Sequence, residues 1–155
     1  MSDKKYVIHE GTEFSTVQVT DGPVLAMRNL KLKEKDGLVF KNLSGSEELL
    51  PYEDWRLDPN ERAADLASRL SIEEIAGLML YSPHQMVPFR PGMPFVGHYN
   101  GEMYQDGKVE PYALSDEQKV LIGKENIRSI LIMALDDADT AARWNNNVQA
   151  MAEQE

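Results

Sequence analysis

The fold class is decided by the stretch Ile127-Arg-Ser-Ile-Leu-Ile-Met-Ala134, an apolar run with a single charged residue. Such a run is typical of a strand that is buried on both faces of a parallel sheet. The acidic residues Asp137 and Asp139 then provide a start for a helix over 139–153, which has an apolar stripe that includes Trp144. The sequence therefore predicts a strand over 127–134 followed directly by a helix.

A strand followed by a helix is half of a βαβ unit, and the helix normally delivers the chain to a parallel neighbour strand. No comparable apolar run occurs elsewhere in the 155 residues. We therefore interpret the chain as an α/β sequence that stops after the first β-α step of a larger domain.

Three capping boxes predict the other helices. The segment Asp58-Pro59-Asn60-Glu61 has a capping Asp, a Pro in the first turn and a Glu three residues after the cap, which favours a helix over 59–70. Ser71 with Glu74 predicts a second helix over 72–80, and Ser115 with Gln118 predicts a short one that ends near Gly123.

Composition excludes several classes of protein. Of the residues, 42% are hydrophobic and 27% are charged, none is Cys, and the net charge is −10. The apolar fraction suits one folded domain, and the absence of Cys excludes disulfides and thiolate metal sites. An acidic chain is not expected to bind nucleic acid through phosphates. We find no secretory signal and no stretch near the roughly 20 apolar residues of a membrane span, so we expect a soluble cytoplasmic protein without membrane or nucleic-acid partners.

Charge and turn signals divide the chain into two regions. Residues 1–43 carry seven basic and six acidic residues, whereas residues 44–75 carry three basic and nine acidic ones. Before this shift, a β-rich segment ends at Asp21-Gly-Pro23, and Lys35-Asp-Gly37 marks a second turn. We predict an N-terminal extension of short strands and loops over 1–57 and a helical body over 58–155, which the resemblance described below identifies as the start of an incomplete barrel domain.

A long Pro- and Gly-rich loop occupies residues 81–111. Its aromatic residues favour an ordered, packed loop, and Asn100-Gly101 is the pair preferred in tight hairpin turns. His84 and Tyr99 are the candidate ligand-binding residues of this loop. Two interpretations are open: these side chains line the outer part of a ligand cleft, or they only pack the loop.

Several segments carry a resemblance to a known family, which covers roughly residues 36–155. They are Pro51-Tyr-Glu-Asp-Trp-Arg-Leu-Asp-Pro59, the helical segment 61–79, Tyr81-Ser-Pro-His-Gln85, Tyr99-Asn-Gly101 and Ala142-Arg-Trp-Asn-Asn-Asn-Val-Gln149. Together they resemble the N-terminal segment of glycoside hydrolase family 3, in particular bacterial β-glucosidases and β-xylosidases.

The resemblance implies a (β/α)8 barrel of the TIM type and retaining hydrolysis of terminal β-linked sugars, with a β-glucoside or β-xyloside as the carbohydrate ligand. That reaction needs two carboxyl groups roughly 5 Å apart. In the family both come later in the chain than Glu155, so no catalytic residue is assigned here and the 155-residue chain is expected to be inactive. No cofactor is implied.

One stretch has part of the ligand pattern of a calcium loop. Over Asn42–Glu53, oxygen-bearing side chains occupy several ligand positions of a twelve-residue loop, namely Asn42, Ser44, Ser46 and Glu53. Glu47 replaces the glycine of such loops and Leu50 a ligand, so a turn that leads into the next helix is the alternative. No other metal site is indicated. We expect Glu53 and Asp54 to pair with Arg56 or Arg62 rather than to act in catalysis.

A second functional hypothesis comes from a different class. The same chain is also consistent with a non-catalytic interaction module, whose exposed sheet edge is completed by a partner or by self-association into a homo-oligomer.

Overall fold

The computed structural model describes residues 4–28 and 31–153, which form two compact units. The first runs to Leu70 and the second spans Ser71–Glu153. This division lies further along the chain than the predicted boundary after residue 57, because the helix that begins at Pro59 packs against the 3-10 turn just before it.

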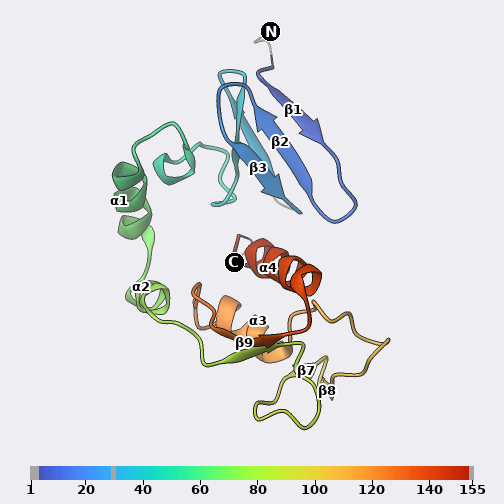
Figure 1. The fold of residues 1–155 in the computed structure, drawn as a ribbon. Helices are drawn as coiled ribbons and strands as arrows, with labels where there is room; N and C mark the ends of the chain where they lie inside the picture. Colours follow the sequence, from blue (N-terminus) through green and yellow to red (C-terminus); the bar gives the residue numbers. More distant parts are fainter. Residues whose placement is uncertain (1–3, 29–30, 154–155) are drawn as a thin grey trace. The chain divides into compact units, whose positions relative to one another are not determined.

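The first unit is built from hairpins. Strands β1 (Tyr6–His9), β2 (Ser15–Val19) and β3 (Val24–Met27) form an antiparallel sheet in that order (Figure 1), and β4 (Leu32–Lys35) pairs with β5 (Leu38–Lys41). Asp36 and Gly37 both have positive φ and form the two-residue turn between β4 and β5, where the sequence predicts a turn. The core gathers Val17, Val19, Met27 and Val39, with Trp55 packed against it.

A 3-10 turn and a helix complete this unit. The turn η1 covers Pro51–Glu53, and α1 covers Pro59–Arg69 with Asp58 as its N-cap, as predicted. Asp65 ties the two together, because its carboxylate accepts a hydrogen bond from the backbone N–H of Tyr52 (3.1 Å) and pairs with Arg69.

The second unit contains a short β-α-β arrangement. Its elements are α2 (Ile72–Met79), β6 (Gln85–Val87), β7 (His98–Tyr99), β8 (Glu102–Met103), α3 (Asp116–Gly123), β9 (Ile132–Leu135) and α4 (Ala138–Ala152). Strands β6 and β9 are parallel neighbours, and α4 packs against β6 and α3 (Figure 1). Trp144 on α4 is buried, as expected for its apolar stripe.

The strand prediction needs three corrections. The strand begins at Ile132 rather than Ile127, because the Ile127 backbone N–H bonds to Leu121 and the Arg128 guanidinium to the Ile122 carbonyl, which closes the end of α3. The strand is covered on one face only, since Met133 is 56% exposed. It also has a parallel partner within the chain: β6 is only three residues long and includes Gln85, so its pattern did not identify it.

The loop over 81–111 is ordered, and it contains β6 and the β7–β8 hairpin. Asn100 and Gly101 have positive φ at the hairpin turn, as predicted. The Asp116 carboxylate at the start of α3 accepts hydrogen bonds from both turn amides (3.1 and 2.8 Å), and Glu117 accepts one from the His98 backbone N–H (2.8 Å). The first turn of α3 therefore fixes the hairpin.

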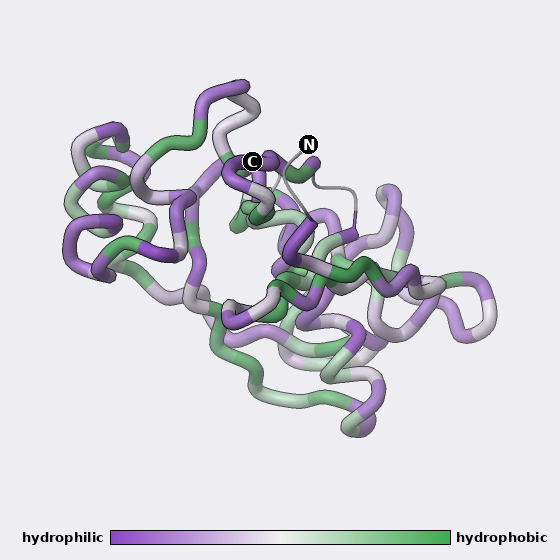
Figure 2. The backbone as a smooth tube through the Cα atoms, turned by 90° about the horizontal axis from the view of Figure 1, so that it is seen from above, coloured by the Kyte–Doolittle hydropathy of each residue, from purple (hydrophilic) through white to green (hydrophobic). Residues whose placement is uncertain are grey.

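Many apolar side chains of the helices and of β9 lie on the surface. The apolar spacing of residues along α1 and α2 predicts that Leu66 and Ile75 are buried, but each is 36% exposed, and Ile72 is 82% exposed. Hydrophobic and hydrophilic stretches alternate along the chain (Figure 2). Within residues 4–28 and 31–153, no helix combines the length and apolar character needed to cross a membrane.

Candidate functional site

A polar cluster lies where β6 and β9 end. Arg90 follows β6 and Asp136 follows β9, and the Arg90 guanidinium pairs with the carboxylates of Asp136 (2.6 Å) and Asp106 (2.7 Å). The same guanidinium stands over the Tyr104 ring, 5.0 Å from its centroid. Because the carboxyl ends of parallel strands are the usual ligand-binding edge of α/β folds, we take this cluster as the candidate functional site.

The cluster borders a pocket of about 280 Å³ that is also lined by Lys108 and Glu110. Hydrogen bonds to Asp136 and Asp106 raise the pKa of Arg90, and the Arg90 hydrogen bond lowers the pKa of Asp106. Burial raises the pKa of Tyr104, so its phenol stays neutral. Arg90, Asp106 and Tyr104 thus keep their usual charge states near neutral pH.

The net charge of the cluster restricts the charge of a ligand that it can bind. Arg90 already has two carboxylate partners, so Arg90, Asp106 and Asp136 together carry a net negative charge and do not favour an anionic ligand. Fixed donors, fixed acceptors and an aromatic ring suit a neutral ligand with several hydroxyl groups. Sequence reasoning missed Arg90 and Asp136; the available signal was that each follows a short apolar stretch, but only the pairing of β6 with β9 brings them together.

The two predicted ligand residues lie in different places. His84 comes just before β6, at the opposite end of that strand from Arg90, and lines an open apolar pocket of about 590 Å³ with Phe89, Phe95 and Val120. Gln85 lines the same pocket, and its Oε1 atom is buried without a hydrogen-bond partner in the described part of the chain.

Tyr99 is part of the packing of the loop. It is 5% exposed, its hydroxyl oxygen accepts a hydrogen bond from the Phe89 backbone N–H (3.1 Å), and its ring contacts Tyr104 edge-on at 5.6 Å. Both its hydroxyl and its ring are therefore occupied within the chain, which favours the packing interpretation for Tyr99.

The acidic residues before α1 are structural. Asp54 pairs with Arg56 (2.6 Å), as expected. The prediction that Glu53 pairs with Arg56 or Arg62 is wrong: its carboxylate pairs with Lys33, from β4. Ser44 also contacts the Lys33 ammonium, whereas the Ser46 hydroxyl accepts a hydrogen bond from Glu48. In residues 4–28 and 31–153, no three His, Cys, Asp or Glu side chains form a group suited to a metal ion.

Comparison with known proteins gives a match to a bacterial glycosidase. The chain is 34% identical over 131 residues to a periplasmic β-glucosidase/β-xylosidase of Dickeya chrysanthemi. This chain is similar to part of a glycosidase. The match covers 84% of the chain but only 18% of the Dickeya protein, so the chain spans less than a fifth of its relative. No family model matches the chain.

Proposed function

We propose that the chain forms the N-terminal part of a retaining β-glycosidase of the glycoside hydrolase family 3 type, which removes terminal β-linked glucose or xylose. The observation that carries the proposal is the similarity to a β-glucosidase/β-xylosidase across 84% of the chain. This similarity extends over both compact units, because a match of 131 residues is longer than either unit.

The fold of the second unit is consistent with the start of a (β/α)8 barrel. Apart from the β7–β8 hairpin inserted after β6, strands and helices alternate in the order β6, α3, β9, α4, and β6 and β9 are parallel. One face of β9 is bare, and a barrel would cover it with further strands and helices. In such a barrel the Arg90 cluster lies on the side where substrates bind, and we propose that it contacts sugar hydroxyls there.

The experiment uses a longer polypeptide that contains this chain and continues past Glu155. We expect it to release nitrophenol from an aryl β-glucoside or β-xyloside with retention of anomeric configuration. Arg90→Met should raise KM for these substrates more than Arg69→Met, a matched change at an exposed ion pair of α1. No hydrolysis of either substrate by the longer polypeptide contradicts the proposal.

The alternative function is an interaction module, and the bare face of β9 favours it as well. Met133 and Leu135 of β9 are 56% and 42% exposed, and Leu131, just before the strand, is 39% exposed. The DNA that follows the codon for Glu155 distinguishes the two functions. An open frame that encodes further strands and helices supports the glycosidase, whereas a stop codon supports the module.

The cytoplasmic location stays a prediction. The name of the Dickeya relative places that protein in the periplasm, but the relation covers only 18% of its length. Fractionation of cells that express the complete gene, with blotting of cytoplasmic and periplasmic extracts, tests the location directly.

A further inference from the structure

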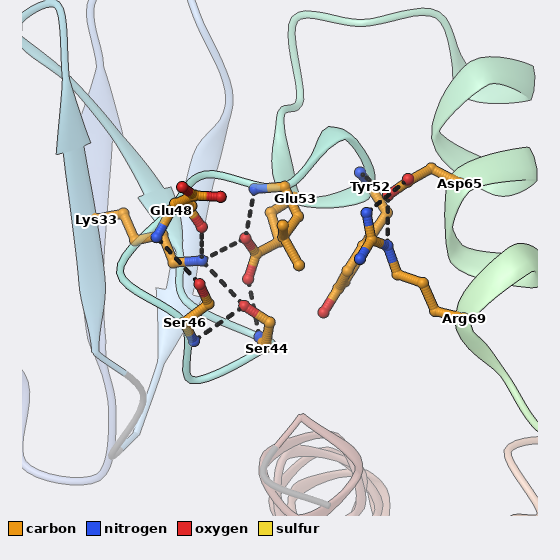
Figure 3. Close-up of polar contacts among 9 residues, drawn as sticks. Lys33, Ser44, Ser46, Glu48, Tyr52, Glu53, Asp65 and Arg69 are labelled. Atoms are coloured by element: carbon orange, nitrogen blue, oxygen red, sulfur yellow. Dashed lines mark hydrogen bonds and ion pairs between the residues drawn. The ribbon is translucent and has the colours of Figure 1, made fainter.

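A buried lysine lies at the centre of the loop Asn42–Glu53. Lys33 comes from β4, and only 6% of its side chain is exposed. Its ammonium donates hydrogen bonds to the Ser44 hydroxyl (3.0 Å), to the Glu48 backbone carbonyl (2.6 Å) and to the Glu53 carboxylate (Figure 3). Three acceptors match the three N–H groups of an ammonium.

The loop is organised around these acceptors. The Glu53 side chain is fully buried, and its two oxygens also accept hydrogen bonds from the backbone N–H groups of Ser44 (2.8 Å) and Leu50 (3.0 Å). The Ser44 hydroxyl accepts a further hydrogen bond from the Ser46 backbone N–H (3.2 Å). The loop therefore directs a hydroxyl, a carbonyl and a carboxylate toward one point.

Hydroxyl, carbonyl and carboxylate oxygens are also the groups that coordinate calcium in a calcium-binding loop. A calcium ion bound to these oxygens would occupy the space of the Lys33 ammonium and meet its positive charge. The loop therefore does not fit a metal ion, because Lys33 Nζ already takes the position of the cation.

We propose that the Lys33 ammonium is the built-in cation of the loop Asn42–Glu53, which makes the fold of the first unit independent of calcium. The lysine is covalently attached, so the loop keeps its cation at any concentration of calcium or chelator. This inference concerns the first unit alone and does not depend on the proposed glycosidase function.

The first experiment follows the thermal unfolding of the 155-residue chain and its amide NMR spectrum with calcium chloride, with EDTA and with neither. We expect the midpoint and the Ser44 and Leu50 amide signals to be the same in all three. A calcium-dependent rise in the midpoint, with shifts of those signals, overturns the proposal.

The second experiment removes the cation. In Lys33→Ala we expect the hydrogen-exchange protection of the Ser44 and Leu50 amides to fall roughly 100-fold, because a buried carboxylate loses its partner. Propylammonium has the atoms that the substitution deletes, so it should restore most of that protection. Neutral 1-propanol should not. The matched control is Lys35→Ala, an exposed lysine of the same strand.

The outcomes separate charge from packing. Equal rescue by 1-propanol would mean that the lysine stem fills space and that its charge is not needed, which overturns the proposal. Full protection in Lys33→Ala without any addition overturns it as well. If Lys33→Ala does not fold, the Nζ–H signal of the ¹⁵N-labelled natural chain decides: slow exchange with solvent supports three hydrogen bonds, and fast exchange contradicts them.

Discussion

The guanidinium of Arg90 lies 2.6 Å from the carboxylate of Asp136, although the two residues are 46 positions apart. Each follows one strand of the parallel pair, so this ion pair of the candidate site joins the carboxyl ends of β6 and β9. Arg90 therefore holds the ends of the two strands together and also forms part of the polar lining of the pocket.

We expect Asp136→Asn to lower the free energy of unfolding by about 1 kcal/mol, after allowing for solvent screening at a site that is about one-third exposed. Asp106→Asn should cost less, because that side chain is 76% exposed. Urea unfolding at low and high salt measures both. A larger loss for Asp106→Asn would mean that the link between the strands is not the stronger pair.

Acid should weaken the first unit through Glu53. Burial raises the pKa of this carboxyl, but hydrogen bonds from Lys33, Leu50 and Ser44 outweigh it and hold the pKa below 4.5. A carboxyl with a lowered pKa stabilises the fold above its unfolded pKa and loses that contribution as the pH falls through its folded pKa. We expect the midpoint temperature of thermal unfolding to decrease as the pH is lowered from 4.5. In Glu53→Gln the midpoint temperature should be lower at neutral pH and should decrease less steeply with acid. Parallel pH profiles of the two chains would contradict this.

A side chain at position 77 is expected to clash with neighbouring backbone atoms. A Cβ at this position would lie 2.5 Å from the Glu125 backbone oxygen and 2.7 Å from that of Asn126. Gly77→Ala should therefore destabilise by about 1–3 kcal/mol, although Ala favours helices over Gly. Thermal unfolding measures the change. The matched variant Ala76→Gly, at the exposed neighbouring position, should cost about 1 kcal/mol through helix propensity alone. Stabilisation by Gly77→Ala would show that α2 is free to move away.

The 155-residue chain should associate as salt rises. Its net charge of −10 opposes contact between copies, but salt screens that repulsion beyond roughly 8 Å at physiological ionic strength. The exposed apolar face of β9 and its edge, unpaired within residues 4–28 and 31–153, remain able to pack against another copy. Sedimentation across a salt series tests this, and Met133→Lys should shift the chain toward monomer. Val24→Lys, on the exposed side of β3, should not. A monomer at every salt concentration would contradict the prediction.

The 155-residue chain should not hydrolyse aryl β-glucosides, because we assign neither carboxyl of a retaining pair to it. Its prominent acidic pair is already engaged, Glu53 with Lys33 and Asp54 with Arg56. Nitrophenol release by the pure chain, with Glu53→Gln and Asp54→Asn as controls, measures this. Activity that disappears in either variant would refute the assignment.

Local signals predicted local structure well. The capping boxes at Ser71 and Ser115 placed two helix starts correctly, and the helices end within one residue of expectation, because caps and stripes act over a few neighbouring residues. The Asn100-Gly101 turn was predictable for the same reason.

Contacts between distant segments could not be predicted in this way. Glu53 has arginines close by in the sequence, yet its partner is Lys33, twenty positions earlier on another element. The parallel pairing of β6 with β9 has no local signature, since three residues are too few to show a period. The (β/α)8 barrel stays a prediction, as does sugar binding by His84.

The clamping of the β7–β8 hairpin by the first turn of α3 makes the chain tolerant to changes of length in one place. Hairpin and helix are joined directly by Asp116 and Glu117, so the connection between them does not set their relative position. Gly107 lies at an exposed point of that connection with a positive φ. A peptide tag inserted after Gly107 would open the turn in which the backbone N–H groups of Lys108 and Val109 bond to the Gln105 carbonyl. It would leave the hairpin and the helix joined through Asp116 and Glu117.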